Sequence, residues 1–351
     1  MSSISVNTIT DASGGSTTSI NGFTPSVSNM AGRNRIINGD MRIDQRNAGA
    51  SVTIPATTVT YTTDRFAAYG SQASKFSVQQ NAGSITPPAG FANYLGVTSL
   101  SAYTVGSGDV FWIRQPIEGY NIADFSWGTA NAKTVTLSFW VRSSLTGTFG
   151  GSVLDNFTPY SYPFSYTISS ANTWEQKTIT IVGPTSGTFP TGNTAGLYLI
   201  FSLGVGSTWS GAAGSYVGVT GATSVVGTSG ATFYITGVQL EEGSVATPFE
   251  HRQYGQELAL CQRYYETGDT MRSSVLNSTS SGCALSQMFQ VKKRAAPTVT
   301  VTGTNALITA SGVAILGNNF DSTASFYHGP SNTISNTHCR YAFGWTASAE
   351  V

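Results

Sequence analysis

The sequence predicts an all-β protein: a jelly-roll β-sandwich followed by one short α-helix and a small C-terminal β-sandwich. Short segments in which apolar and polar residues alternate recur between turns rich in Gly, Pro, Asn and Ser. This alternation is typical of strands that bury one face. One segment has helical spacing instead. The length of 351 residues is enough for about two domains with cores of their own.

The composition disfavours two classes of partner. The chain has 17 Lys and Arg against 17 Asp and Glu, and charged residues make up 10% of it, well below the roughly 25% of an average domain. A neutral chain lacks the basic surface that attracts nucleic acids or anionic membranes. The uncharged stretch 178–240 is interrupted by Gly, Ser, Thr and Pro, so we expect no membrane insertion. Hydroxyls, amides and aromatic rings favour protein chains or sugars as partners.

Residues 1–32 form a polar N-terminal segment with a single charge, Asp11. Ile4, Val6 and Ile9 alternate with polar residues, as in a strand, but nothing nearby supplies a core. Such a segment becomes ordered by adding itself to the sheet edge of another chain. We therefore expect an anchoring arm in which these three residues make the contact. A free tail is the alternative.

The jelly roll is predicted over residues 33–250. Alternating segments without a convincing helix among them indicate a sandwich or barrel, and a jelly roll with long loops reaches this length. The clearest strand segments are 75–78, 134–141, 175–182, 196–203 and 231–240.

Residues 251–268 are predicted to connect two β regions through a helix running from about residue 252 to 266. Four residues at i, i+4, i+7 and i+11 form one stripe of this helix: Tyr254, Leu258, Cys261 and Tyr265. Gly268 follows as its C-terminal stop. The stripe is expected to pack against one of the β regions, or against symmetry mates in an oligomer.

Residues 269–351 are predicted to form the C-terminal β-sandwich, with strands at 286–292, 298–302, 305–316 and 340–347. In the last strand Tyr341, Phe343 and Trp345 share one face, which must be covered. A domain of about 85 residues has little core of its own. We therefore expect this region to associate with copies of itself.

Nucleophilic and zinc chemistry have no support, because the three histidines lack metal-site spacing and no phosphate loop or nucleophile elbow occurs. Cleavage of a glycan needs only two carboxylates a few ångströms apart. The sequence does not show whether any two acidic residues of the jelly roll converge; the candidates are Asp64, Asp109, Glu118, Asp124, Asp155 and Glu175. We predict no enzymatic activity.

Aromatic residues in and beside the predicted loops indicate sugar binding. A sugar lays its C–H face on an aromatic ring while nearby amides and hydroxyls bind its hydroxyl groups. The candidate glycan-binding residues are Tyr120, Trp127, Tyr160, Tyr162 and Trp209. Ordinary packing at an edge or in the core is the alternative for each of them.

Six short segments stand out as a set: 34–43 (NRIINGDMRI), 63–66 (TDRF), 237–252 (GVQLEEGSVATPFEHR), 256–265 (QELALCQRYY), 294–300 (RAAPTVT) and 346–351 (TASAEV). Together they frame about 320 of the 351 residues. They resemble bacteriophage tail-fibre and minor structural proteins. The central domain is similar to jelly-roll carbohydrate-binding modules.

The resemblance implies a place for a metal. In such modules the opening Asn-Gly-Asp segment lies beside the closing Val-Gln-Leu-Glu strand, and some modules hold a structural calcium there. Asp40, Gln239 and Glu241 would offer the oxygen ligands in this chain. Thr236 and Gly237 stand where acidic residues are common in the family. No other cofactor is expected.

The resemblance also implies an assembly. The family resembles homotrimeric fibres, so residues 1–32 would attach to other virion proteins, such as a tail adaptor, nozzle or baseplate, and residues 269–351 would be the trimerisation domain. The protein would be located in the virion after assembly in the host cytoplasm. Its three cysteines, an odd number without ligand spacing, suit a reducing compartment.

We therefore expect a tail fibre that binds host-surface polysaccharide, because several copies per particle turn weak sugar contacts into firm adhesion. One alternative is a capsid fibre or decoration, or a passive spacer that carries a separate receptor-binding protein. A second is a depolymerase that cuts surface polysaccharide. A third, a secreted bacterial glycan-binding module, is disfavoured because the first 21 residues lack the basic residues and apolar core of a secretory signal.

Overall fold

The structure is a computed structural model of the full chain. It describes residues 32–155, 160–212, 217–275, 285–302, 313–314, 325–330 and 339–350. The predicted anchoring arm, with Ile4, Val6 and Ile9, lies outside the described residues. Within the described part of the chain, no helix is long and apolar enough to cross a membrane.

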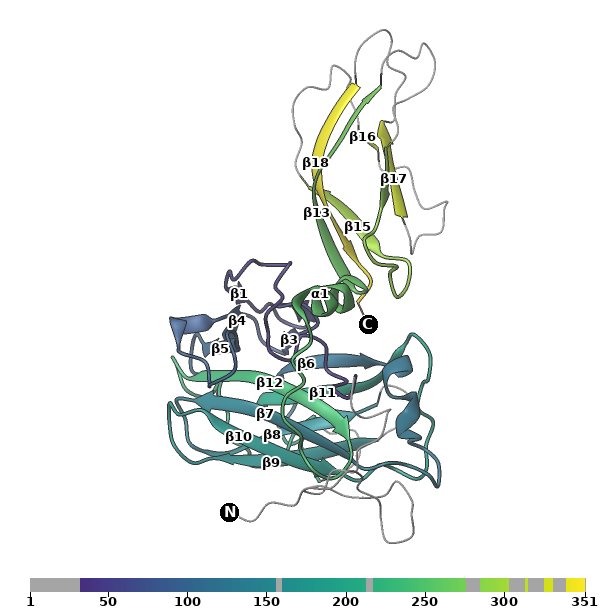
Figure 1. The fold of residues 1–351 in the computed structure, drawn as a ribbon. Helices are drawn as coiled ribbons and strands as arrows, with labels where there is room; N and C mark the ends of the chain where they lie inside the picture. Colours follow the sequence, from purple (N-terminus) through teal and green to yellow (C-terminus); the bar gives the residue numbers. More distant parts are fainter. Residues whose placement is uncertain are drawn as a thin grey trace, which may run out of the picture. The chain divides into compact units, whose positions relative to one another are not determined.

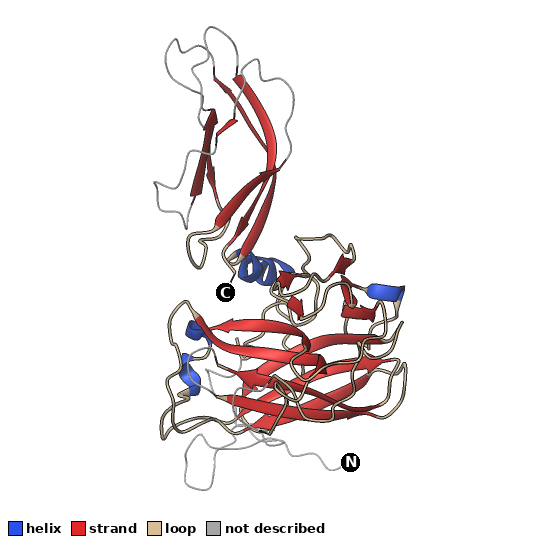
Figure 2. Ribbon diagram, turned by 180° about the vertical axis from the view of Figure 1, so that it is seen from behind, coloured by secondary structure: helices blue, strands red, loops and turns tan. Residues whose placement is uncertain are grey.

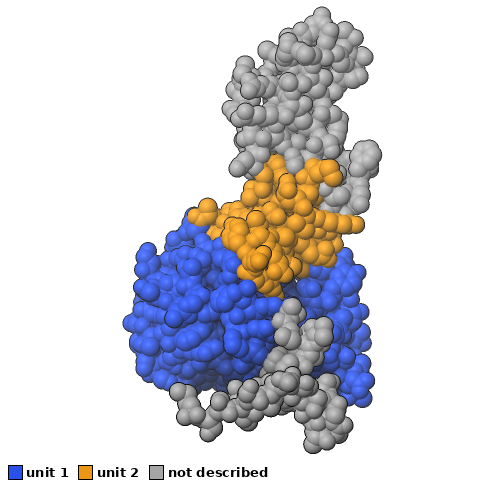
Figure 3. All heavy atoms as spheres, in the orientation of Figure 1, with its two compact units in different colours: residues 1–42, 49–62, 66–251 blue, residues 43–48, 63–65, 252–351 orange. Residues whose placement is uncertain are grey.

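The described chain folds into two compact units (Figure 3). The first comprises residues up to 42, 49–62 and 66–251, and the second comprises 43–48, 63–65 and the residues from 252 onward. Strands dominate both units (Figure 2), which confirms the predicted all-β class with one short α-helix. The second unit takes two short segments from the region over which the sequence predicts the jelly roll.

The first unit is a sandwich of two six-stranded antiparallel sheets (Figure 1). Sheet 1 consists, in spatial order, of β1 (Val52–Thr53), β4 (Phe76–Gln80), β5 (Leu95–Ser99), β12 (Thr232–Glu242), β7 (Val135–Ser143) and β10 (Glu175–Ile181). Sheet 2 consists of β2 (Thr60–Tyr61), β3 (Ala67–Gly70), β6 (Val110–Glu118), β11 (Ala195–Val205), β8 (Gly147–Leu154) and β9 (Ser161–Ile168). Short 3-10 helices lie at Ala82–Ser84, Gly119–Asn121 and Ala123–Phe125.

The core lies between these two sheets and follows from strand alternation. In β7, Leu137, Phe139 and Val141 are fully buried, whereas Trp140 and Arg142 lie on the opposite face and stay partly exposed. Successive side chains of a strand point to opposite faces, so a period of two in the sequence becomes one face toward the core and one away from it. Each strand segment predicted for the jelly roll coincides with a strand, namely β4, β7, β10, β11 or β12.

The first described residues run beside β12 without forming a regular strand. The N–H of Arg35 donates to the carbonyl of Leu240 at 2.9 Å, and the N–H of Val238 donates to the carbonyl of Gly39 at 2.9 Å. The Asn-Gly-Asp segment and the closing strand are therefore neighbours, as the resemblance implies.

The second unit contains α1 (Tyr254–Gln262) and two three-stranded antiparallel sheets. One sheet consists of β13 (Tyr265–Val275), β18 (Cys339–Ser348) and β15 (Thr298–Thr302), and the other of β14 (Leu285–Met288), β17 (Ser325–Pro330) and β16 (Val313–Ala314). In the aromatic face predicted for the last strand, Trp345 is buried as expected. The side chains of Tyr341 and Phe343 lie outside the described part.

The predicted helix is wrong at its C-terminal end. α1 has nine residues, and Gly268 does not stop it but lies within β13, opposite Trp345. A Cβ on Gly268 would lie 2.3 Å from Cε2 of the Trp345 indole, so glycine is needed for the close approach of the ring. The predicted stripe is also wrong in part, because the helix buries Glu257 and Cys261 whereas Tyr254 is exposed.

The two short segments of the second unit each contribute an arginine. Arg46 and Arg65 both form ion pairs with Glu350, at 2.7 Å for Arg46. The Arg65 guanidinium also lies over the Tyr264 ring, 3.5 Å from its centroid. One carboxylate near the C-terminal end therefore holds both segments, and residues from the N-terminal half belong to the fold of the second unit.

Candidate functional site

Trp127 is a core residue. Its side chain is buried, Nε1 donates to the carbonyl of Lys133 at 2.8 Å, and the indole packs against Tyr160 and Phe189 with centroids 5.6 and 5.7 Å away. No face of the ring is free for a sugar, which corrects the prediction for this residue.

Tyr160 and Tyr162 also pack against the core. Both are half-buried. The hydroxyl of Tyr160 is shielded from solvent, and burial raises the pKa of Tyr160. The hydroxyl of Tyr162 donates to the carbonyl of Thr180 at 3.3 Å. Tyr160 therefore serves packing, and Tyr162 offers at most part of its ring to a ligand.

Tyr120 and Trp209 are exposed, at 63% and 39%, but they do not belong to one site. Tyr120 lies two residues after Glu118, the last residue of β6. The Trp209 indole N–H donates to the carbonyl of Gly108 at 3.1 Å, which places it before the first residue of β6. Strand β6 has nine residues and is therefore about 30 Å long. The two rings lie at its opposite ends.

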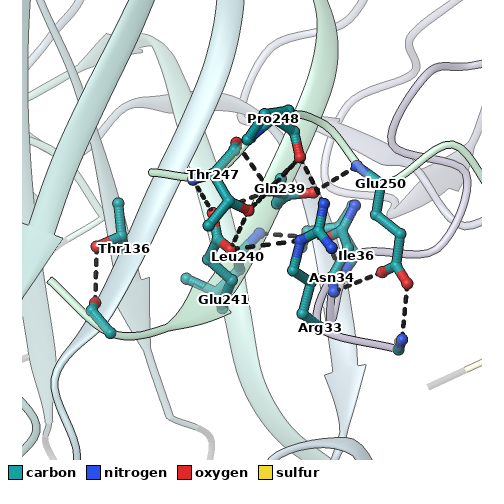
Figure 4. A network of polar contacts seen from close by, with 12 residues as sticks. Arg33, Asn34, Ile36, Thr136, Gln239, Leu240, Glu241, Thr247, Pro248 and Glu250 are labelled. Carbon is teal, nitrogen blue, oxygen red and sulfur yellow. Dashed lines mark hydrogen bonds and ion pairs between the residues drawn. The ribbon is translucent and has the colours of Figure 1, made fainter. Parts of the chain in front are cut away.

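The residues predicted to bind calcium use their oxygens otherwise (Figure 4). In Glu241, Oε1 accepts from the Gln239 amide at 2.9 Å and from the N–H of Thr247 at 2.8 Å. Its Oε2 accepts from Thr247 Oγ1 at 2.6 Å. The Gln239 carbonyl oxygen accepts from the N–H of Glu250 at 2.8 Å. These oxygens are already held by N–H and O–H donors.

Positive charge is also already present beside these residues. The third residue, Asp40, accepts from Nε of Arg42 at 2.6 Å, and Nε of Arg33 lies 3.7 Å from Oε2 of Glu241. In the described ranges, no three or more His, Cys, Asp or Glu side chains are grouped so that they hold a metal. Asp40, Gln239 and Glu241 therefore do not fit a calcium ion, because donors and guanidinium groups take the place of the cation.

The acidic residues considered for hydrolysis are largely held by other groups: Asp109 by Tyr103 at 2.8 Å, Asp124 by Arg35 at 2.5 Å, and Glu175 by Lys177 at 2.6 Å. Asp64 belongs to the second unit. Glu118 and Asp155 are buried. No pair stands out as catalytic among the described residues, and the absence of enzymatic activity stays a prediction.

A row of three aromatic rings and one guanidinium crosses the outer face of sheet 2. It consists of Tyr69 on β3, Trp112 and Arg114 on β6, and Tyr198 on β11, and we call it the arginine row. Tyr69 and Trp112 are cross-strand partners whose rings stack, with centroids 5.3 Å apart and planes at 15°. Cζ of Arg114 lies 4.5 Å from the Trp112 centroid and 4.4 Å from the Tyr198 centroid. The guanidinium therefore contacts rings of two neighbouring strands.

Strand alternation places this row away from the core. In β6, Phe111 and Ile113 belong to the core between the sheets, so Trp112 and Arg114 point to the other face. Strand β6 pairs with β3 on one side and with β11 on the other. Because adjacent strands lie about 4.8 Å apart, outward side chains of the three strands become neighbours.

Arg114 has unused hydrogen-bond donors. A guanidinium carries five N–H donors, and none of them has an acceptor among the residues that the structure describes; Nε is also shielded from solvent. Burial lowers the pKa of Arg114, although an arginine keeps its charge in proteins. Trp112 is 6% and Tyr198 7% exposed, whereas Arg114 and Tyr69 are partly exposed. A ligand that reaches the row therefore meets Arg114 and Tyr69.

A second aromatic group lies on the outer face of sheet 1, with Trp140 and Arg142 on β7 and Trp174 directly before β10. Its polar groups have partners in the chain. Nε1 of Trp174 donates to the carbonyl of Thr86 at 2.9 Å, and Nε of Arg142 donates to the carbonyl of Asn172 at 2.9 Å. It is the weaker candidate, because its donors are already hydrogen-bonded within the chain.

Sequence reasoning missed the arginine row because it looked for sugar-binding rings in loops. The signal was present in residues 110–118, where Trp112 and Arg114 alternate with Phe111 and Ile113. A large ring and a charge at the outward positions of a strand indicate a functional face of the sheet.

Comparisons with known proteins give fold likenesses of low similarity. No protein-family model matches the chain, and no curated protein is similar to it in sequence. Solved structures that match include the enzymatically active domain of tailspike protein 4 of bacteriophage CBA120 (TM-score 0.29, 14% identity, 60% of this chain and 21% of that one). A putative sugar-binding protein from Bacteroides thetaiotaomicron also matches (TM-score 0.34, 12% identity, 60% and 100%).

A family 11 carbohydrate-binding module from Clostridium thermocellum, in complex with a mixed-linked tetrasaccharide, is a further match (TM-score 0.28, 10% identity, 53% of this chain and 91% of that one). This chain therefore spans about a fifth of the tailspike domain's length and nearly all of the module's. TM-scores of 0.34 and below are too low to carry an argument about function. The function proposed next rests on the residues of this chain.

Proposed function

We propose that the first unit binds glycans at the arginine row, and that the chain is a bacteriophage tail-fibre protein that uses this site to adsorb to host-surface polysaccharide. The observation that supports the binding site is Arg114, a guanidinium held against two aromatic rings with no acceptor among the described residues. Its Nε is shielded from solvent, and a buried donor without a partner costs free energy. A ligand with oxygen acceptors recovers that free energy.

The row combines the two kinds of group that a sugar needs. Tyr69, the partly exposed ring of the row, offers apolar surface on which the C–H bonds of a pyranose pack. Arg114 presents several donors to the oxygens of the same sugar. Stacking on Trp112 and Tyr198 holds the guanidinium in place, so little side-chain entropy is lost on binding.

The virion role rests on the sequence resemblance. In this proposal residues 1–32 attach the fibre to a tail adaptor, nozzle or baseplate, three chains form one fibre, and the assembled protein resides in the virion. Three binding sites per fibre raise the effective concentration of each site near the cell surface. Weak binding of a single sugar is then sufficient for adsorption.

The binding site is tested with the full chain on a printed glycan array. Tyr69→Ala is expected to weaken binding about 10-fold, because it removes one ring of the row. Tyr120→Ala is the matched control, since Tyr120 is an exposed tyrosine of the same unit outside the row. Equal effects of the two variants, or no binding to any glycan, would overturn the proposed site.

The virion role is tested on particles of a phage that encodes the chain. Immunogold electron microscopy is expected to label the tail, and antibodies against the first unit are expected to block adsorption. Label on the capsid would identify a capsid fibre or decoration. Tail label without any block of adsorption would identify a passive spacer, and both outcomes contradict the adsorption role.

A further inference from the structure

We infer that the arginine row selects an acidic sugar, whose carboxylate binds to Arg114. This inference rests on the proposed glycan-binding function and names the class of ligand. It depends on the charges of the described residues around Arg114, which differ from those around other arginines of the chain.

Most other arginines whose side chains the structure describes have acceptors: Arg142 donates to a backbone carbonyl, and several others pair with carboxylates. Six of them form ion pairs, with the carboxylates of Asp40, Asp124, Glu241, Glu257 and Glu350: these are Arg33, Arg35, Arg42, Arg46, Arg65 and Arg252. Arg114 has neither an ion pair nor a hydrogen bond among the described residues. In a chain with equal numbers of acidic and basic residues, its charge is left for a ligand to neutralise.

Among the described residues, the neighbours of Arg114 on its own face supply no carboxylate. Across the adjacent strand β11 lies Ile200, its register partner, and the next outward residue on β6 is Pro116. Glu118 is on the same face but four residues along β6, about 13 Å away. The ring of Trp112 and that of Tyr198 lie against the guanidinium. The immediate surroundings therefore attract an anion without competition from a nearby acid.

The shape of the group favours a carboxylate. A guanidinium is a planar fork that binds both oxygens of a carboxylate through two parallel N–H···O bonds. The Trp112 and Tyr198 rings lie against the guanidinium, and these aromatic surroundings strengthen its charge interaction with a ligand by excluding water. A uronic or sialic acid offers such a carboxylate on a sugar ring, and its neutral counterpart offers only hydroxyl groups.

The test compares matched acidic and neutral glycans on one array, using the full chain. The pairs are glucuronate- and glucose-terminated, galacturonate- and galactose-terminated, and sialylated and unsialylated oligosaccharides. The wild-type chain is expected to bind the acidic member of at least one pair about 10-fold more tightly, which is the range of a charge-assisted hydrogen bond. Arg114→Gln is expected to abolish this ratio, and Arg114→Lys to retain part of it because the charge stays while the fork is lost.

Arg142→Gln is the matched control, since it removes an arginine from the outer face of the other sheet and is expected to leave the ratio unchanged. Thermal unfolding checks that each variant is folded. Equal binding of acidic and neutral members by the wild-type chain, or an acidic preference that survives Arg114→Gln, would overturn the inference. If Tyr69→Ala still weakens binding in that case, the proposed glycan site stands. If the wild-type chain binds none of the glycans, the glycan-binding site itself is rejected.

Discussion

Replacing Glu350 by Gln is expected to destabilise the second unit by about 3–5 kcal/mol. The Glu350 side chain is 6% exposed and pairs with Arg46 and Arg65, which are 12% and 1% exposed. A neutral amide removes the carboxylate that pairs with two largely buried guanidinium groups, and the loss of that negative charge destabilises the unit. The contact of Arg65 with Tyr264 does not replace the ion pair, since a cation–π interaction contributes only about 0.5–2 kcal/mol.

Glu242→Gln is the matched control. Glu242 pairs with Lys133 at 2.9 Å, and the two side chains are 38% and 41% exposed, so this change is expected to cost less than about 1 kcal/mol. Hydrogen exchange measured by mass spectrometry follows the two units separately, because it reports local free energies of opening. Peptides from β13 and β18 are expected to exchange at least about 100-fold faster in Glu350→Gln than in the wild type, whereas peptides from β7 and β12 keep their rates. The same exchange rates in both variants would refute the stabilising role of the buried ion pairs.

Arg114→Met is expected to raise the free energy of unfolding of the first unit by about 1 kcal/mol in urea titrations, because an apolar chain replaces a partly buried cation without acceptors; a loss of stability would contradict this account. Burial raises the pKa of Asp64 from 3.8 to about 6, so between these values the native state holds a proton that the unfolded chain has released. The free energy of unfolding of the second unit should therefore increase by about 2.4 kcal/mol as the pH falls from 7 to 4, relative to Asp64→Asn measured over the same range. A chelator is expected to leave the melting temperature of the full chain unchanged, because Glu241 is already held by Gln239, Thr247 and Arg33; a fall of several degrees would reveal a bound cation. Sedimentation is expected to give three times the 36.8 kDa of one chain, and a stable monomer would contradict the trimer.

The all-β class could be predicted because it depends on local patterns. In residues 134–141 and 175–182, a period of two is enough to identify a strand, and the structure pairs these two segments as β7 and β10. The pairing itself, and the order of the strands in each sheet, depend on contacts between residues far apart in the sequence. The pattern of one segment does not contain that information.

The errors have the same origin. Gly268 follows a helical stripe and has the character of a helix stop, yet its role is set by Trp345, which packs on it from a strand 77 positions later. Likewise, Arg46 and Arg65 lie within the predicted jelly roll but belong to the second unit, because Glu350 binds them. Long-range partners overrule local preference in each of these cases.

The candidate site was predicted less well than the fold, because exposure was assumed from loop position. Trp127 follows a short 3-10 helix and has polar neighbours in sequence, yet it packs between Tyr160 and Phe189 in the core. Large aromatic rings bury much apolar area and are therefore drawn into a core wherever a loop allows it. Outward positions of strands are the better place to search, because a strand fixes the direction of its side chains and a loop does not.

Six described arginines form ion pairs and Arg142 donates to a backbone carbonyl, whereas Arg114 has no acceptor among the described residues. This difference carries information. Sequence, packing and charge agree at most positions of a folded protein, and the places where they disagree are expected to be functional. If Arg114 served only to hold sheet 2 together, a nearby carboxylate would be expected beside it, and Arg114→Met would lower stability. A binding residue behaves in the opposite way: its replacement stabilises the free protein and removes ligand binding. The mutation removes the desolvation cost of donors without acceptors, as a bound ligand would. Measuring stability and glycan binding in this one variant therefore distinguishes a structural arginine from one that binds an acidic sugar.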